Sequence, residues 1–337
     1  MEGGNGRVCV TGASGYLGSW LVMRLLQRGY SVRGTVRSLE DKSKTEHLLS
    51  LPEAKEKLEL VEADLLVYSS IPAAVKGCDG VFAVAVPILD PSKDQSGMIE
   101  LAMTSTMNLL RACDESHCVK RVVMTSTYYS AIQVPHEGEI PFEVDESSWT
   151  SVEYCMQQKM SCWGYMVAKT LAEKAAFEYA KEKEFDLISI LPSLVGGAFL
   201  TPSVPGSVAL YLGAMTDVAT WMSSLLGYMS YVHVDDTIQA HILLMEDSHA
   251  KGRYLCSAVD ATLDDVLHEV LPLLKSFNIP PPKVAASLDE DPTKAYYKIN
   301  TTKLKDMGFT YEFDTLQKIF KDSVLFFLEK GHLKQVQ

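Results

Sequence analysis

A glycine-rich turn near the start of the chain leaves few folds open to it. Thr11-Gly-Ala-Ser-Gly-Tyr-Leu-Gly18 directly follows the apolar run Arg7–Thr11 and opens an amphipathic stretch. Glycines let the backbone turn tightly and approach a pyrophosphate, and free N–H groups at a helix start favour negative charge. The turn therefore predicts a strand–turn–helix unit that binds a dinucleotide, and the alternative is a turn that binds nothing. The predicted binding residues of the turn are Gly12, Ser14, Gly15, Tyr16, Leu17 and Gly18.

Short β-branched runs alternate strictly with amphipathic stretches through the first half of the chain. The predicted strands are Arg7–Thr11, Ser31–Val36, Leu58–Glu62, Gly80–Ala85, Arg121–Thr125 and Asp186–Leu191. The predicted helices are Tyr16–Arg28, Ser69–Lys76, Asp94–Ser116 and Met160–Lys183. This alternation is typical of an α/β fold with a Rossmann-type, doubly wound parallel sheet, which we expect over residues 1–192.

After Pro192 the chain becomes richer in Gly, Pro and Ser and then enters an apolar stretch. This change predicts a smaller C-terminal substrate-binding lobe made of residues 193–228 and 259–337, with 229–258 returning to the first domain. Within the second half we expect a strand over Met229–Val234 and helices over Thr262–Lys275 and Thr315–Lys330.

Composition argues against several classes of partner and site. A net charge of −12 disfavours nucleic acid, which binds through a dense Lys/Arg surface. The seven cysteines show no C-x-x-C pair and no histidine spaced for zinc, so we expect no metal site and reduced thiols. The apolar stretch from Val204 to Val232 is interrupted by glycines and polar residues, which predicts no membrane span. With no recognisable targeting segment, we expect a cytoplasmic protein. A monomer and a homodimer both stay open, because the long helices predicted over Asp94–Ser116 and Met160–Lys183 form a dimer bundle in some relatives of this fold.

Basic residues follow the second predicted strand, where an NAD-preferring fold carries an acidic residue for the ribose hydroxyls. The sequence there is Arg33-Gly-Thr-Val-Arg37, and Lys44 follows. A guanidinium can hold the 2′-phosphate through charge-assisted hydrogen bonds, which favours NADPH/NADP as the cofactor. The alternative is that both cations are solvated surface charges. Asp64, which precedes Leu65, either accepts a hydrogen bond from the adenine or caps the next segment.

Tyr165-Met-Val-Ala-Lys169 places a phenol and an ammonium on one face of a predicted helix. A carbonyl that receives hydride needs a proton on its oxygen, and a phenol can supply it when a nearby cation lowers its pKa. A second match, Tyr179-Ala-Lys-Glu-Lys183, lies fourteen residues further on, or about 21 Å along a helix. We predict that Tyr165 and Lys169 form the proton-transfer pair, because Tyr179 lies in a Lys/Glu-rich helix end that we expect to be exposed to solvent.

A third catalytic group is expected at the end of the fifth strand, because ligands of open α/β sheets bind at the carboxyl ends of the strands. Arg121-Val-Val-Met-Thr-Ser-Thr127 offers hydroxyls at Ser126 and Thr127. Either hydroxyl is suited to hold a substrate oxygen. The alternative for both is an ordinary strand-end hydroxyl bonded to backbone.

These residues together resemble the extended short-chain dehydrogenases/reductases, and within them the plant group that includes dihydroflavonol, anthocyanidin and vestitone reductases. The T-G-x-x-G-x-x-G spacing, one residue longer than G-x-G-x-x-G between the first two glycines, is typical of that family. The matching segments are Val8–Trp20, Thr35-Val-Arg37, Val122–Ser126, Tyr165–Ala175, Leu191-Pro-Ser-Leu-Val195 and Val232-His-Val-Asp-Asp236.

The resemblance implies an NADPH-dependent reductase of a ketone or aldehyde on an apolar or aromatic plant metabolite of flavonoid, isoflavonoid or alkaloid type. It makes Tyr165 the acid, Lys169 its partner and Thr127 the hydroxyl donor. Further implied cofactor positions are Leu65, Val84, Ala85, Val86, Thr125, Ser126, Pro192, Leu194 and Val195. Two alternatives stay open, an NADP-dependent alcohol or hemiacetal dehydrogenase of an alkaloid-type substrate and a non-catalytic scaffold that binds the cofactor.

The chain departs from the family pattern near the expected substrate site. Thr127 stands where the family usually has serine, and threonine is stiffer at χ1. Relatives often carry histidine at position 83 and Thr or Ser at position 86, where this chain has Ala83 and Val86, which predicts a more apolar pocket. The predicted substrate-binding residues are Tyr128, Tyr129, Met215, Trp221 and Leu225, each of which has ordinary core packing as its alternative.

Overall fold

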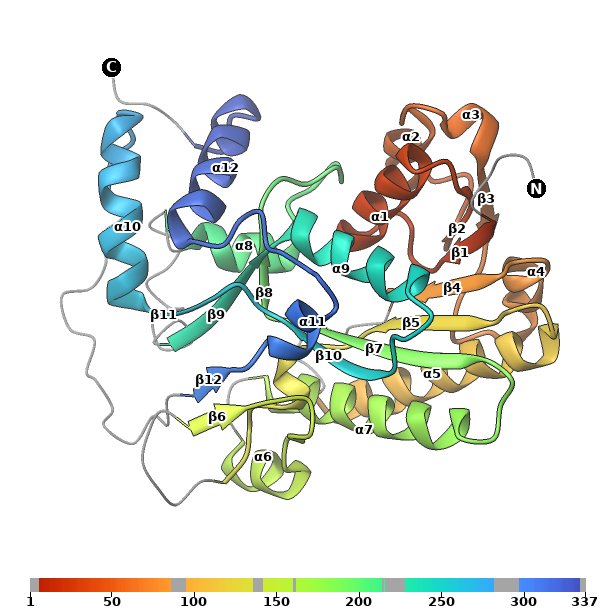
Figure 1. Ribbon diagram of the computed structural model, residues 1–337. Coiled ribbons are helices and arrows are strands. Elements are labelled where there is room, and N and C mark those ends of the chain that lie inside the picture. Colours follow the sequence, from red (N-terminus) through yellow and green to blue (C-terminus); the bar gives the residue numbers. More distant parts are fainter. Residues whose placement is uncertain are drawn as a thin grey trace.

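The computed structural model describes residues 6–85, 95–135, 142–159, 162–213, 215, 228–281 and 297–333. Its largest element is a seven-stranded parallel sheet with the strand order β10-β7-β5-β4-β1-β2-β3 (Figure 1). The strands of this sheet are β1 (Arg7–Val10), β2 (Ser31–Val36), β3 (Leu58–Glu62), β4 (Gly80–Ala83), β5 (Arg121–Thr125), β7 (Asp186–Pro192) and β10 (Gly252–Cys256). The predicted Rossmann-type sheet is confirmed, and its first six strands along the chain are the six predicted ones.

Helices cover both faces of the large sheet (Figure 1). The helices associated with it are α1 (Tyr16–Gln27), α2 (Lys42–Leu49), α3 (Ala54–Lys57), α4 (Pro72–Val75), α5 (Gln95–Ser116), α7 (Trp163–Ala180) and α9 (Val234–Glu246). Leu21 and Leu25 of α1 share one apolar core with Ile238 of α9, whereas Leu109 of α5 and Ala176 of α7 belong to another. In α1 and α9 the buried apolar side chains recur at three- and four-residue spacing, so one stripe faces the sheet.

Strand β4 ends two residues before its predicted end, for a local reason. The N–H groups of Val84 and Ala85 donate to the Thr11 side-chain oxygen, at 3.0 and 3.1 Å, and not to a neighbouring strand. The predicted helix over Ser69–Lys76 is likewise divided into a 3₁₀ turn, η1 (Tyr68–Ser70), and α4, whose first residue is Pro72. Proline lacks the N–H that would continue the preceding turn, which explains the division.

A smaller unit contains the three-stranded sheet β11-β9-β8, with the two-stranded sheet β12-β6 beside it. The strands are β6 (Phe142–Val144), β8 (Leu194–Gly196), β9 (Tyr228–His233), β11 (Val259–Thr262) and β12 (Tyr297–Ile299). The remaining helices are η2 (Tyr128–Ser130), α6 (Val152–Gln158), α8 (Gly206–Gly213), α10 (Leu263–Ser276), α11 (Thr302–Asp306) and α12 (Leu316–Glu329). Helices α10 and α12 lie within one residue of the ends predicted for them.

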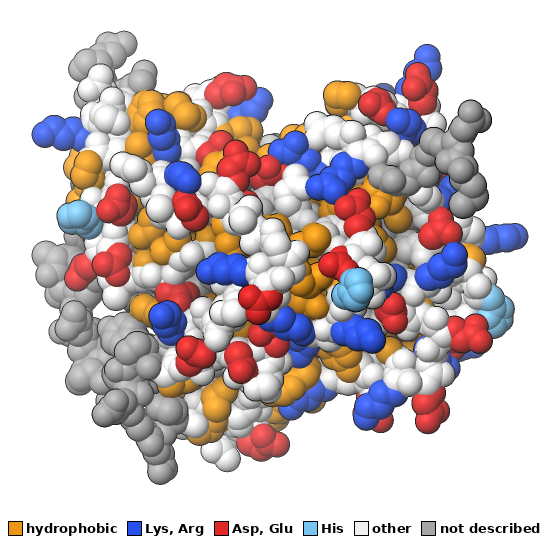
Figure 2. All heavy atoms as spheres, viewed as in Figure 1, with side chains coloured by type: hydrophobic (Ala, Val, Ile, Leu, Met, Phe, Trp, Pro, Cys, Tyr) orange, Lys and Arg blue, Asp and Glu red, His pale blue; other side chains and the backbone are white. Residues whose placement is uncertain are grey.

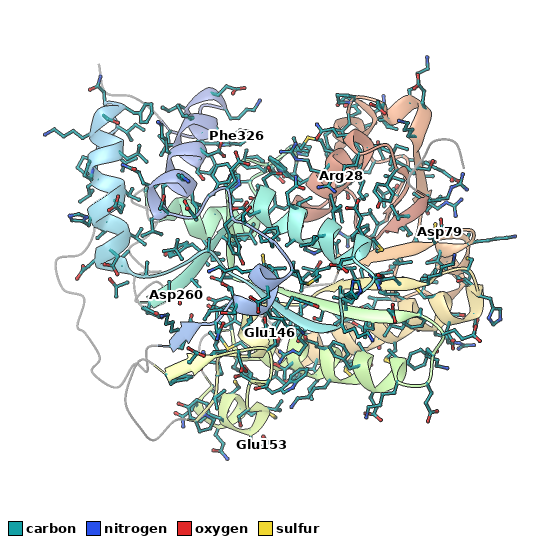
Figure 3. All side chains as sticks on the ribbon, viewed as in Figure 1. Arg28, Asp79, Glu146, Glu153, Asp260 and Phe326 are labelled. Carbon is teal, nitrogen blue, oxygen red and sulfur yellow. The ribbon has the colours of Figure 1, made fainter. Side chains whose placement is uncertain are left out.

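The chain passes between the two units more than once. Of the stretch 229–258, which we expected to return to the first domain, α9 and β10 lie with the large sheet, while β9 is the central strand of the small one. In the opposite direction, β6 from the first half pairs in parallel with β12 near the end of the chain. At the lower end of the small sheet, Asp260 accepts hydrogen bonds from Ser230 Oγ at 2.6 Å and Ile299 N at 2.9 Å (Figure 3).

Strands β1 and β4 are neighbours in the sheet. From β1 the chain continues to β2 and β3 on one side, and from β4 it continues to β5, β7 and β10 on the other, so the strand order reverses between β1 and β4. A crevice for a ligand opens at such a reversal, outside the carboxyl ends of the strands. The glycine turn follows β1, and the ends of β4, β5 and β7 lie along the same edge. The topology therefore brings the predicted site residues to one side of the sheet.

On the face shown in Figure 2, acidic and basic side chains are interspersed and do not form a field of one sign. Among the described residues, no helix combines the length and the apolar character needed to cross a membrane.

Candidate active site

The glycine turn is closed so tightly that side chains would overlap backbone. Gly12 has a positive φ of 64°, and a Cβ there would lie 2.7 Å from Ala85 Cβ. A Cβ on Gly18 would lie only 2.2 Å from the carbonyl oxygen of Gly12. Gly15, at the N-cap of α1, is exposed and carries no side chain to cap the helix. The first N–H groups of α1 are thus open to an anion, as a dinucleotide site requires.

Two threonines that the sequence reasoning missed fix the turn from both sides. The Gly12 N–H donates to Thr35 Oγ1 at 3.0 Å, and the Ala13 N–H donates to the Thr35 carbonyl at 2.9 Å. Thr11 accepts hydrogen bonds from the N–H groups of Val84 and Ala85 and so holds the other side of the turn. The available signal was a hydroxyl at the end of each of two neighbouring strands.

Replacing Gly18 with alanine is expected to weaken both the fold and dinucleotide binding. The added methyl group overlaps the Gly12 carbonyl, which is backbone and cannot rotate away, so the start of α1 must shift at a cost of about 1–3 kcal/mol. Denaturant unfolding and a fluorescence titration with the dinucleotide measure the two losses. Gly206→Ala is the matched control, because a Cβ there meets no atom within 4 Å. Equal behaviour of the two variants would contradict the close-packed turn.

The two arginines of the second strand have different surroundings. Arg33 is buried, and its guanidinium bonds Glu59 at 2.9 Å and the carbonyl of Lys76 at 2.6 Å. Arg37 lies just beyond the end of β2, is exposed, and makes no hydrogen bond or ion pair within the described part of the chain. Arg37 is therefore the arginine available to a phosphate. Lys44 is also exposed, on α2.

Asp64 caps the segment that follows it, as one of the two alternatives anticipated. Its Oδ1 accepts a hydrogen bond from the Leu66 N–H at 2.9 Å. The neighbouring Leu65 is buried, and its carbonyl accepts from the Asn108 side chain at 2.9 Å.

Tyr165 and Thr127 meet at the carboxyl end of β5. Tyr165, in the first turn of α7, is partly exposed, and Thr127 follows β5 by two residues. Burial raises the pKa of Tyr165 to about 12, and a side-chain hydrogen bond with Thr127 acts in the opposite direction. The Thr127 Oγ1 also accepts from the Tyr129 N–H at 3.3 Å, which orients the hydroxyl. The two hydroxyls together can bind one substrate oxygen.

Lys169 is held one helical turn from Tyr165. Its ammonium is buried and donates to the carbonyl oxygen of Thr125 at 2.7 Å. Burial lowers the pKa of Lys169 to about 8, while the carboxylate of Glu173 acts to raise it. In this arrangement Thr127, and not Lys169, is the neighbour whose hydrogen bond lowers the pKa of the Tyr165 phenol.

The second tyrosine–lysine match lies in a different environment. Tyr179 donates to Asp114 on α5 at 3.0 Å, and Lys183 contacts both that carboxylate, at 2.8 Å, and the Tyr179 ring, at 4.6 Å from its centroid. These contacts fasten the end of α7 to α5. Tyr179 is thus occupied in helix packing.

The other predicted cofactor residues lie along the same edge, with much of their bonding capacity used. The Thr125 hydroxyl lies 2.7 Å from His241 Nε2, and the Ser126 hydroxyl donates to Glu173 at 2.8 Å. Leu194 and Val195 lie on β8 and direct buried side chains into the two apolar cores. Pro192 ends β7, Val84 and Ala85 are partly exposed beyond β4, and Val86 lies outside the described residues.

Aromatic rings form a wall beside Tyr165. Tyr129 meets the Tyr165 ring edge to face, with centroids 6.5 Å apart and planes at 85°. Tyr128 packs on Tyr129 at 4.4 Å and on Tyr297 of β12 at 6.3 Å, and it is fully buried. Met215 is buried in the core of the smaller unit. Trp221 and Leu225 lie outside the described residues.

Sequence reasoning missed a buried polar group behind the site, made of Glu173, Arg253 and Ser130. The signal was present, since Glu173 is four residues beyond Lys169 and hence on the same face of α7. Among the described residues no cluster of three or more His, Cys, Asp or Glu side chains is arranged to hold a metal ion.

Comparisons with a family model, with known sequences and with solved structures agree on one family of relatives. The model of the NAD dependent epimerase/dehydratase family matches residues 8–256. Dihydroflavonol 4-reductase of Arabidopsis thaliana is 41% identical over 327 residues, which cover 97% of this chain and 83% of that protein. The crystal structure of vestitone reductase from alfalfa (Medicago sativa L.) superimposes with a TM-score of 0.80 at 33% identity, covering 98% of this chain and 100% of that one.

A further solved structure contains a cofactor. Gre2 of Candida albicans in complex with NADPH superimposes with a TM-score of 0.79 at 25% identity, covering 96% of this chain and 99% of that one. The similarities therefore extend over almost the whole chain, and one of the similar structures holds NADPH, the predicted cofactor.

Proposed function

Because the chain belongs to the NAD dependent epimerase/dehydratase family, we propose that it reduces a ketone or aldehyde on a flavonoid-type aromatic substrate, with Tyr165 as the proton donor. The chain is an NADP(H)-dependent oxidoreductase. The observation that carries the proposal is the meeting of the Tyr165 and Thr127 hydroxyls at the carboxyl edge of the sheet, beside the glycine turn.

The residues present fit NADPH. The glycine turn is so closely packed that a Cβ at position 12 or 18 would overlap neighbouring atoms, and the exposed Arg37 lies beyond the end of the neighbouring strand. When bound, NADPH supplies the hydride. We assign the 2′-phosphate to Arg37, with Lys44 contributing charge from α2, because a guanidinium binds phosphate through two parallel hydrogen bonds.

The protein's part in the reaction is to bind and protonate the carbonyl oxygen. Negative charge develops on that oxygen as hydride arrives, and positioned hydroxyls stabilise it. Thr127 orients the oxygen, and Tyr165 donates its proton. Because a phenol with a raised pKa is fully protonated at neutral pH, Tyr165 is in the correct state to act as an acid.

Two observations support an aromatic substrate. Dihydroflavonol 4-reductase and vestitone reductase, by their names, act on flavonoid-type compounds and resemble this chain over nearly its full length. Tyr129 presents a ring next to the reacting hydroxyls, and aromatic pairs prefer the edge-to-face geometry it already makes with Tyr165.

A substrate panel tests the proposal. Flavonoid, isoflavonoid and alkaloid ketones and aldehydes are each incubated with enzyme and NADPH, and the corresponding alcohols and hemiacetals with NADP. We expect NADPH consumption with at least one flavonoid-type carbonyl. Turnover confined to alcohols or hemiacetals with NADP would show that the enzyme oxidises its substrate and would contradict the proposed reduction. No turnover of any compound would favour a non-catalytic scaffold.

Thr127→Ala is expected to lower kcat by about 10-fold or more, because it removes a hydrogen bond to the developing oxyanion worth roughly 1.5–3 kcal/mol. Thr127→Ser keeps the hydroxyl and should retain most of the activity. Steady-state kinetics on the substrate found in the panel separate the two variants. If Thr127→Ala equals wild type in kcat, the threonine hydroxyl has no part in the reaction.

A further inference from the structure

We propose that the buried ion pair between Glu173 and Arg253 is a positioning device for the reaction, which holds the Thr127 loop and the Lys169 ammonium in the geometry that Tyr165 requires. This inference rests on the proposed function. Both charged groups are buried, so each acts through the residues that it holds.

Glu173 bonds the Thr127 loop on both sides of the catalytic threonine. Its Oε2 accepts from Ser126 Oγ at 2.8 Å and from Ser130 Oγ at 2.6 Å. Ser126 immediately precedes Thr127 at the end of β5, and Ser130 follows Thr127 by three residues within η2. One carboxylate oxygen therefore fastens the backbone that carries the Thr127 hydroxyl.

The charge of Glu173 is balanced by Arg253 of β10. Arg253 Nε lies 2.9 Å from Glu173 Oε1, and the carboxylate side chain is fully buried while that of the arginine is 6% exposed. The guanidinium is fixed in turn by the carbonyls of Glu146 and Ser148 and by the Trp149 ring, 3.6 Å away. Glu146 lies near β10 (Figure 3), and its own carboxylate accepts from the Leu255 N–H.

The helix spacing links this pair to the reacting groups. Tyr165, Lys169 and Glu173 occur at intervals of four residues along α7, so they line one face. That face contacts the end of β5 at each step, through the bond of Tyr165 with Thr127, of Lys169 with the Thr125 carbonyl, and of Glu173 with Ser126. Glu173 sets where this face lies against the strand end.

Stability alone does not explain a buried ion pair. Removing two charges from water costs about as much as their attraction returns, and apolar replacements of such pairs are often neutral or stabilising. A pair that is kept fully bonded, next to a reacting group, is better explained by the geometry and the field that it provides.

The field of Glu173 acts on Lys169. The carboxylate favours the charged ammonium and raises the pKa of Lys169 against the lowering effect of burial. Among the described residues, further titratable groups of this region are Tyr165 on the same helix, Arg253 on β10, which bonds Glu173, and His241 on α9, which bonds the hydroxyl of Thr125. Burial lowers the pKa of His241 to about 4, so that the imidazole is neutral near pH 7.

Glu173→Gln removes the charge but keeps the shape of the side chain. We expect kcat to fall about 10- to 100-fold, as misplacement of reacting groups does, with little change in KM. The activity of the wild type should decline above about pH 8 as Lys169 loses its proton, and in Glu173→Gln this decline should move to lower pH. Ser126→Ala keeps the charge, so it should lower kcat without moving the decline.

Asp235→Asn is the matched control. Asp235 forms a two-point ion pair with Arg24, at 2.7 Å for each bond, between α9 and α1 and away from the Thr127 loop. We expect this variant to lower the melting temperature and to leave kcat and the pH profile unchanged. If Glu173→Gln does not fold, the double variant Glu173→Met/Arg253→Met replaces it, because it leaves no unpaired charge.

Tyr165→Phe, assayed in parallel, separates the two possible failures. If Tyr165→Phe turns over normally, the proposed function fails. If Tyr165→Phe is inactive while a folded Glu173 variant keeps both the kcat and the alkaline decline of the wild type, the positioning role is overturned and the proposed function stands.

Discussion

Tyr165→Phe is expected to lower kcat by about 10²–10⁴-fold while leaving the Kd for NADPH nearly unchanged. The substitution removes only the hydroxyl that meets Thr127 and keeps the ring that packs against Tyr129. The carbonyl oxygen then receives hydride without a nearby acid. Single-turnover kinetics with the substrate from the panel, and fluorescence titration of NADPH, measure the two quantities separately.

Tyr179→Phe is the matched control, since it removes the same atom from the same helix. Its hydroxyl bonds Asp114 on α5, so we expect a small loss of stability and normal turnover. Equal kcat values for the two variants would contradict the assignment of the acid, and so would a loss of turnover confined to Tyr179→Phe.

Arg37→Ala is expected to weaken NADPH binding by about 1.5–3 kcal/mol, the usual worth of a hydrogen bond to a charged group, and to leave NADH binding nearly intact. This corresponds to roughly a 10- to 150-fold increase in the Kd for NADPH. The reason is that NADH lacks the 2′-phosphate and therefore loses nothing when the guanidinium is removed. Parallel fluorescence titrations with the two cofactors measure the ratio.

Arg33→Met serves as the contrast to Arg37→Ala. Arg33 bonds Glu59 and three backbone carbonyls inside the protein, so its loss should lower the free energy of unfolding. It should affect the two cofactors alike. A selective loss of NADPH in Arg33→Met, or an equal loss of both cofactors in Arg37→Ala, would refute the phosphate role of Arg37.

Much of the fold was accessible from the sequence because local rules decide it. The strands Ser31–Val36, Leu58–Glu62 and Arg121–Thr125 have the ends predicted for them, and α10 and α12 differ by one residue. Several elements were not predicted, among them α9 and β10. Helix α9 begins after His233, whose Nδ1 accepts a hydrogen bond from the Asp235 N–H and caps the helix. Strand β10 is defined by its pairing with β7. A strand that depends on a distant partner has a weak local pattern.

The candidate site divides in the same way. Two tyrosine–lysine pairs satisfied one spacing, and one arginine lies within the second strand while another follows its end. The sequence preferred Tyr165 on position and Arg37 on analogy with a known fold. In the structure, Tyr179 bonds Asp114 and Arg33 bonds Glu59, so neither of these two alternatives is placed to act in the site.

By itself, then, the sequence determined the glycine turn, the alternating βα order and the tyrosine–lysine spacing, because each depends on residues within a few positions of one another. The tertiary structure alone decided which hydroxyl faces Tyr165, how the glycine turn is tied down by Thr11 and Thr35, and that Glu173 meets Arg253 eighty residues away. Such contacts form only when the sheet brings distant strand ends together, and no local pattern encodes them.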